Sequence, residues 1–224
     1  CVGRSEPPIL QFDPSGKLLT SFCGGMFAFP HGFTVDGEGN VWASDANANE
    51  TVLGISARGS NGVMRGHQIF KFSPAGKVLM TIGKAGVAGN GPDTFDQPSG
   101  IAVAPNGDIF VTDGHGKNDR VVKFSKDGRF IKAWGHHGSG PGEFDQPHDI
   151  SIGGSQGRVF IADRSNNRVQ IFDQEGNFMA AWKQFGRPSA VYVSRDDTLY
   201  VSDSQSNSKV NAGMARGIYV GSAR

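Results

Sequence analysis

The chain has 224 residues, with 22 basic and 21 acidic side chains and a formal net charge of +1 at pH 7. This near-neutral balance, without a lysine- or arginine-rich block, argues against a nucleic-acid partner. No apolar run approaches the roughly 18 residues of a membrane-spanning helix. The 33 glycines and 11 prolines are typical of an all-β chain with many turns.

Cys1 and Cys23 are the two cysteines, and their spacing matches no metal-binding motif. Cys1 is interpreted either as a lipidated residue left after signal cleavage or as the plain start of a fragment. No signal peptide is visible, so the compartment stays open, and a secreted or periplasmic location is favoured.

Short β-branched and aromatic segments, bounded by glycine, aspartate, asparagine and proline, predict strands along the whole chain. Ile9–Phe12 and Leu18–Phe22 resemble the last two strands of a four-stranded unit. The predicted strands of the following units are Gly32–Val35, Val41–Ser44, Gln68–Phe72 and Val78–Ile82; Ile101–Val103, Asp108–Val111, Val121–Phe124 and Phe130–Trp134; Ile150–Ile152, Val159–Ala162, Val169–Phe172 and Phe178–Trp182; and Val191–Val193, Leu199–Val201 and Gly217–Val220. A segment rich in asparagine, glycine and serine between Ala46 and Gly66 is predicted to be a surface loop.

A repeat organises these strands. The first strand of each unit follows a proline (Pro30, Pro98, Pro147 and Pro188), and an aspartate ends the second strand 15, 15, 16 and 15 residues later (Asp45, Asp113, Asp163 and Asp203). Antiparallel four-stranded units repeating at roughly 40–50 residues predict the blades of a β-propeller. We expect a single domain over residues 1–224, incomplete at both ends and covering about four and a half blades. Its open blade edges favour self-association, and the repeated aspartates are predicted to accept backbone hydrogen bonds.

Strand direction places all four repeat openings on one face, where long loops also lie. The residues after the prolines are His31, Ser99, His148 and Ser189. Two histidines on alternate blades suit a zinc site that takes a third ligand from a further blade. The alternative, that each histidine satisfies a backbone group at a strand start, stays open.

Three segments resemble the NHL-repeat family of six-bladed propellers: 95–103, 144–150 and 163–172. A narrower resemblance is to the peptidyl-α-hydroxyglycine α-amidating lyases. It implies zinc on His31 and His148, and a substrate carboxylate held by Arg164. It also implies a structural calcium bound by the backbone carbonyl of Phe33.

The sequence departs from that lyase pattern in three places. His115 stands where the family has a catalytic tyrosine, and is interpreted as a general base or as an exposed loop histidine. The third zinc histidine and an N-terminal arginine of the family site lie in blades that this sequence does not contain. Arg164 has the alternative of a salt bridge within its own loop, and His136 and His137 are predicted to be solvated.

The leading hypothesis is a zinc-dependent carbon–nitrogen lyase that cleaves a carbinolamide of a small peptide or amide into an amide and glyoxylate. The alternative is a non-catalytic NHL-repeat propeller that binds a peptide, glycan or protein on the long-loop face. A third hypothesis, a calcium-dependent lactonase-like propeller, would require Glu, Asp and Asn at the channel mouth, where His and Ser stand instead.

Overall fold

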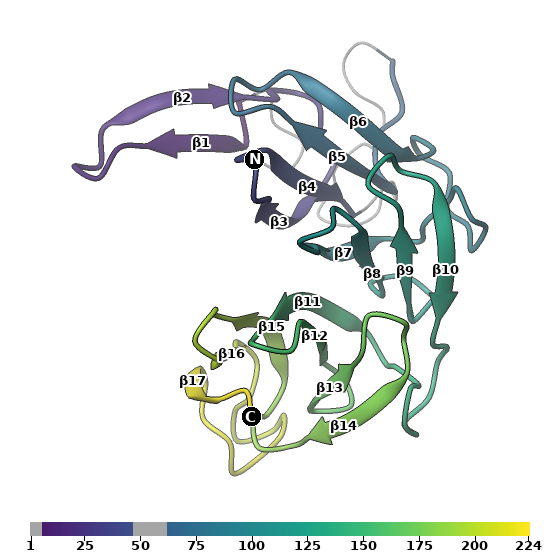
Figure 1. Cartoon of the computed structure of the whole chain (residues 1–224), viewed down its shortest axis with the longest axis vertical. Coiled ribbons are helices and arrows are strands. Elements are labelled where there is room, and N and C mark those ends of the chain that lie inside the picture. Colours follow the sequence, from purple (N-terminus) through teal and green to yellow (C-terminus); the bar gives the residue numbers. More distant parts are fainter. Residues whose placement is uncertain (1–5, 47–61) are drawn as a thin grey trace. The chain divides into compact units, whose positions relative to one another are not determined.

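A computed structural model describes residues 6–46 and 62–224, in which all the regular elements are β-strands (Figure 1). Cys1 and most of the segment between Ala46 and Gly66 lie outside the described residues. The chain divides into two units, Cys1–Pro98 and Ser99–Arg224. The expectation of a single domain over the whole chain stays a prediction.

The first unit contains a two-stranded hairpin and one four-stranded antiparallel sheet. Its strands are β1 (Ile9–Phe12), β2 (Leu18–Phe22), β3 (Pro30–Val35), β4 (Val41–Asp45), β5 (Gln68–Phe72) and β6 (Val78–Gly83). The hairpin pairs β1 with β2, and the sheet runs in the order β3-β4-β5-β6. Ile9 and Phe27 pack with Phe70 and Phe72 in the core of this unit. The prediction of two leading strands before a complete blade is confirmed.

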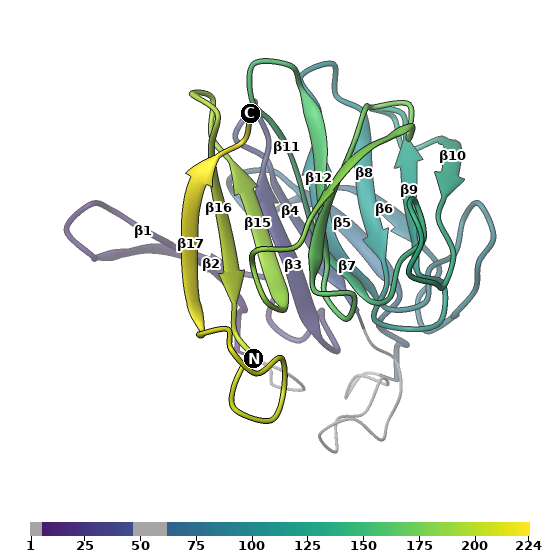
Figure 2. The same ribbon diagram turned by 90° about the horizontal axis from the view of Figure 1, so that it is seen from below.

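The second unit contains three sheets. Its strands are β7 (Pro98–Val103), β8 (Ile109–Asp113), β9 (Arg120–Phe124), β10 (Phe130–Trp134), β11 (Pro147–Gly153), β12 (Arg158–Asp163), β13 (Arg168–Phe172), β14 (Phe178–Trp182), β15 (Pro188–Val193), β16 (Thr198–Asp203) and β17 (Gly217–Ser222). Two sheets have four strands each, β7–β10 and β11–β14, and the last has three in the order β15-β16-β17 (Figure 2). The predicted meander of each blade is therefore confirmed. The first strands of all four blades begin at the repeat proline itself, since proline is tolerated at the first position of a strand.

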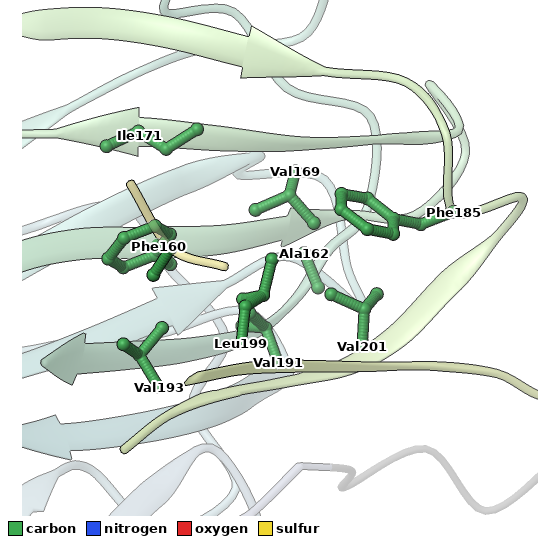
Figure 3. Close-up of a cluster of buried hydrophobic side chains, with 10 residues drawn as sticks. Phe160, Ala162, Val169, Ile171, Phe185, Val191, Val193, Leu199 and Val201 are labelled. Atoms are coloured by element: carbon green, nitrogen blue, oxygen red, sulfur yellow. The ribbon is translucent and has the colours of Figure 1, made fainter. Parts of the chain in front are cut away.

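Apolar side chains from neighbouring sheets of the second unit form its core. Phe110 and Phe144 pack with Phe172, and Phe160 packs with Phe185 and the valines of β15 and β16 (Figure 3). Trp134 of β10 packs against Phe172 of the next sheet, with ring centroids 6.1 Å apart. This tryptophan therefore packs between two blades of the second unit.

The repeated aspartates are structural, as predicted. Asp45 accepts hydrogen bonds from the backbone of Ala28, Phe29 and Gly66, and is fully buried. Asp203 does the same for the segments that precede β15 and follow β16. Each of these carboxylates joins the opening of its blade to the loop after the second strand by hydrogen bonds, and so holds both segments in place.

One face of the last sheet is apolar and exposed. Tyr192 of β15, Tyr200 of β16, and Ile218 and Val220 of β17 are exposed to 60%, 40%, 71% and 63%. The register pairs Tyr192 with Tyr200 and Tyr200 with Val220, so these side chains share one face of the sheet. Among the residues with described positions, there is no helix of the length and apolar character that crossing a membrane requires.

Candidate functional site

The residue after three of the repeat prolines lies at an irregular step of the strand pairing. In β11 the register shifts between Pro147 and Asp149, which places His148 at the shift. Ser189 lies at the equivalent shift in β15, and His31 lies within the shift of β3. Such β-bulges re-aim a side chain out of the regular alternation and are enriched next to active sites.

A hydrogen bond fixes the orientation of the His148 ring. Its Nδ1 lies 2.7 Å from the carbonyl oxygen of Ser189 in the neighbouring blade. A carbonyl oxygen only accepts, so Nδ1 carries the proton and Nε2 of the neutral ring carries the lone pair. An imidazole held in this way by a backbone carbonyl is the usual arrangement of a metal-binding histidine.

His115 lies beside His148. The two ring centroids are 4.7 Å apart, and the rings offer nitrogen atoms within 4.8 Å of each other. His115 is half-buried, so the alternative of an exposed loop histidine is wrong. That alternative rested on the glycines on either side of His115, which suggested an open loop, and the role of His115 as a general base stays a prediction.

Gly114 allows this approach of two blades. A Cβ atom at Gly114 would lie only 2.4 Å from Cδ and from the carbonyl oxygen of Pro147. The absence of a side chain therefore lets the loop after β8 contact the opening of β11. As a result, two imidazoles far apart in sequence lie next to each other.

The two serines of the repeat brace the strand openings. Ser99 is fully buried, and its hydroxyl lies 2.8 Å from the carbonyl oxygen of Pro147, to which it donates. The Ser189 hydroxyl lies 3.1 Å from that of Ser202 in its own blade. The Ser99 hydroxyl therefore supports the strand opening that presents His148, whereas the Ser189 hydroxyl bonds within its own blade.

A buried carboxylate adds a further link between the blades at this point. Asp149 accepts a hydrogen bond from the backbone amide of Val191 at 3.0 Å. Burial raises the pKa of Asp149 to about 6, against the hydrogen bonds that favour its ionised form. The strand that carries His148 is therefore tied to β15 at the histidine and at the residue that follows it.

His31 and Phe33 lie in the first unit. His31 is half-buried, with its ring centroid 5.8 Å from that of Phe29. The backbone amide of the next residue, Gly32, donates to the Ser44 hydroxyl at 2.6 Å. The Phe33 side chain is 59% exposed. The assignments of His31 to zinc and of Phe33 to calcium remain predictions.

Arg164 lies in the loop after β12 and makes no ion pair with the residues that the structure describes, so the alternative of a salt bridge within its loop is wrong. Its Nη2 donates to Oε1 of Gln146 at 2.6 Å. Its Nε is buried without a hydrogen-bond partner within residues 6–46 and 62–224. Burial and then the positive charge of Arg187 lower the pKa of Arg164, while Asp145 opposes them. A partly desolvated guanidinium of this kind is suited to an anionic ligand.

The sequence interpretation missed Arg187. This arginine precedes the repeat proline of β15, and its Nη2 lies 3.5 Å from the hydroxyl of Ser165, next to Arg164. The signal was present in the repeat, since Gln97 and Gln146 stand at the same position in the two preceding blades.

The remaining histidines lie elsewhere. His136 and His137 have side chains exposed to 75% and 70%, in agreement with their predicted solvation. His137 nevertheless pairs with Asp119 at 2.8 Å, which raises its pKa. Asp145 adds a third ligand atom within 4.8 Å of these two. His67 is buried in the first unit, where its Nδ1 accepts a hydrogen bond from Gln97.

Comparison with known proteins supports the fold and the resemblance. A family model described as "6-bladed beta-propeller" matches residues 103–210. The chain is 20% identical to virginiamycin B lyase from Staphylococcus aureus, with a TM-score of 0.57 over 86% of this chain and 55% of that one. The chain is 16% identical to a gluconolactonase from Xanthomonas campestris, with a TM-score of 0.61 over 86% of this chain and 61% of that one. The blades and these likenesses define the chain as a β-propeller protein.

Sequence relatives narrow the class further. The chain is 38% identical over 169 residues to peptidyl-glycine alpha-amidating monooxygenase A of Xenopus laevis, which covers 72% of this chain and 16% of that protein. It is 37% identical over 136 residues to peptidyl-alpha-hydroxyglycine alpha-amidating lyase 1 of Drosophila melanogaster, covering 59% and 21%. It is 33% identical over 167 residues to human NHL repeat-containing protein 3, covering 73% and 44%. The chain therefore spans less than half the length of each of these relatives, and its resemblance to NHL-repeat propellers and amidating lyases is confirmed.

Proposed function

We propose that this propeller is a metal-dependent lyase that cleaves the carbinolamide of a peptidyl-α-hydroxyglycine into a peptide amide and glyoxylate. The observation that carries the proposal is the pair of adjacent imidazoles, His115 and His148, with the ring of His148 oriented by the Ser189 carbonyl. The amidating-lyase relatives supply the reaction class.

The residues fit a zinc ion. His148 presents the lone pair of Nε2, and His31 occupies the same repeat position in the first unit. Both histidines would hold the metal, and any further ligand would come from a group other than these two side chains. A bound zinc ion supplies Lewis acidity, which lowers the pKa of a hydroxyl group that binds to it.

In the second unit, His115 would transfer the proton and Arg164 would bind the substrate carboxylate. His115 takes the hydroxyl proton of the carbinolamide, for which a neutral imidazole is suited near pH 7. The C–N bond breaks as the carbonyl of glyoxylate forms, and the proton passes to the departing amide nitrogen. Arg164 holds the carboxylate of the hydroxyglycine end through charge-assisted hydrogen bonds.

Two further assignments belong to the same proposal. The Phe33 carbonyl is a calcium ligand that stabilises the opening of β3, by analogy with the lyases. The site would act on secreted or periplasmic peptide substrates, in line with the amidating relatives.

The NHL repeat-containing relative favours a second candidate function. In it the same face binds a peptide, glycan or protein without catalysis. The two candidates differ in one observable, because a binding module needs neither zinc nor turnover.

The experiment is a measurement of zinc content and glyoxylate release for the purified protein and its His31→Ala, His148→Ala and His115→Ala variants. We expect the first two variants to lose zinc, and His115→Ala to lose turnover while keeping zinc. Loss of zinc in His115→Ala would make this residue a ligand instead of the base. Zinc absent from the unaltered protein, or unaffected by both ligand substitutions, would refute the lyase.

A further inference from the structure

Two arginines lie side by side in the second unit, and neither forms an ion pair with the described residues. Arg187 Nη2 reaches the hydroxyl of Ser165, the residue that follows Arg164. Burial lowers the pKa of Arg164, and the positive charge of Arg187 lowers it further. Among the described residues, no ion pair within 4 Å involves either guanidinium, although other arginines such as Arg120 and Arg168 form such pairs.

Glutamine side chains hold both guanidinium groups. Arg164 donates to Gln146 at 2.6 Å, and Arg187 Nε donates to Gln205 at 3.0 Å. The backbone amide of Arg187 is in turn fixed by the carboxylate of Asp203 at 3.1 Å. Neutral amides orient an arginine without neutralising it, so the positive charge stays available to a ligand.

Arg164 also has a donor group that is available to a ligand. Its Nε is buried without a hydrogen-bond partner within the described part of the chain. A buried N–H group that lacks a partner costs free energy, and an anion that accepts from it would recover that loss. The two like charges at close range also favour an anionic ligand, because an anion between them relieves their repulsion.

We propose that Arg164 and Arg187 together form a carboxylate-binding site, in which Arg187 is a second binding residue for the free carboxylate end of an N-acyl amino acid. The inference deepens the proposed function, since that carboxylate is the one carried by a hydroxyglycine substrate. Arg187 then sets specificity for chains that end in a carboxylate over those that end in an amide.

The local charge favours a monoanion. Asp145 acts on Arg164 electrostatically, less than burial or Arg187 does, and makes no ion pair with it among the described residues. The three groups together carry a net charge of +1, which matches a carboxylate. A phosphate dianion would leave excess negative charge next to Asp145.

The test measures binding of N-benzoylglycine, a stable N-acylglycine that cannot undergo the reaction, by calorimetry. Its neutral amide and inorganic phosphate serve as competing probes. The variants are Arg187→Gln, Arg187→Lys and, as a matched control, Arg195→Gln, because Arg195 is an exposed arginine of the β15–β16 turn. Circular dichroism and zinc content are recorded for each.

We expect Arg187→Gln to weaken binding of N-benzoylglycine about tenfold or more, the effect of one charge-assisted hydrogen bond. Arg187→Lys should recover part of the loss, and Arg195→Gln should bind as the unaltered protein does. The neutral amide should bind weakly and equally to all variants. Unchanged binding in a folded Arg187→Gln variant would overturn the proposal, as would phosphate binding more tightly than N-benzoylglycine.

The outcome is separable from the fate of the lyase proposal. Carboxylate binding that depends on Arg187, in a protein without zinc or turnover, would support the site and refute the lyase. Zinc and glyoxylate release together with binding indifferent to Arg187 would do the reverse.

Discussion

Replacing Asp163 by alanine should destabilise the protein more than any substitution in an exposed turn. Asp163 is fully buried at the end of β12 and lies 2.6 Å from Nε of Arg168, which is 4% exposed. It also accepts hydrogen bonds from the Asp145 amide and the Gln170 side chain. The change removes the only carboxylate paired with Arg168 in the described part of the chain.

The expected loss is about 3–5 kcal/mol of unfolding free energy, the usual consequence of leaving one partner of a buried ion pair. Arg168 keeps its hydrogen bonds to the carbonyl oxygens of Ser139, Gly140 and Glu143, which places the loss toward the lower end. The matched control is Asp173→Ala. Asp173 accepts from two backbone amides in the β13–β14 turn, and its loss should cost only about 1 kcal/mol.

Urea unfolding followed by tryptophan fluorescence provides the measurement, since Trp134 and Trp182 lie in the same unit. The double variant Asp163→Leu with Arg168→Leu should be less destabilised than the sum of the two single variants, because no unpaired charge stays buried. A loss below about 1 kcal/mol for Asp163→Ala, or strict additivity in the double variant, would refute the reasoning.

Three other predictions address the site, the pH dependence and the open sheet. Gly114→Ala should lower the unfolding free energy by about 1–3 kcal/mol through overpacking against the neighbouring strand, and should lower turnover by displacing the adjacent imidazole. The control Gly37→Ala should do neither, because the space around its Cβ position is open. Equal unfolding midpoints for the two variants would contradict this. Burial tends to raise the pKa of Asp36, but hydrogen bonds from the Trp42 indole and nearby amides outweigh it and hold the value at about 2. Because that pKa lies below the ordinary value of 3.8, its contribution of about 2 kcal/mol is present above pH 4 and lost as the pH falls toward 2, and acid unfolding of Asp36→Asn should lack this component. Ile218→Lys with Val220→Lys should abolish any self-association seen by sedimentation velocity, and association that persists would exclude this sheet face as the contact.

The structure shows how the serines that alternate with the histidines contact the blade that carries His148. The sequence showed the two residue types at equivalent positions, which suggested a site built from every second blade. The hydrogen bonds show that Ser99 supports the Pro147 carbonyl, while the carbonyl of Ser189 orients His148. Both serines act on the blade between them, so the intervening positions are part of the support for the histidine.

The sequence by itself determined the strands, the turns and the blade repeat of this protein. These features depend on local properties: β-branched and aromatic runs, glycine at turn positions, and proline where a strand begins without needing an amide donor. The structural role of Asp45 and Asp203 also followed from their fixed place in the repeat.

Only the tertiary structure decided which side chains meet. His115 lies next to His148 because Gly114 lets two blades approach closely, and Arg187 lies next to Arg164 across another pair of blades. Contacts of this kind depend on how consecutive sheets pack and on the direction in which a bulged residue points. A repeat pattern fixes the order of the blades, whereas the meeting of their loops depends on packing between residues far apart in the chain.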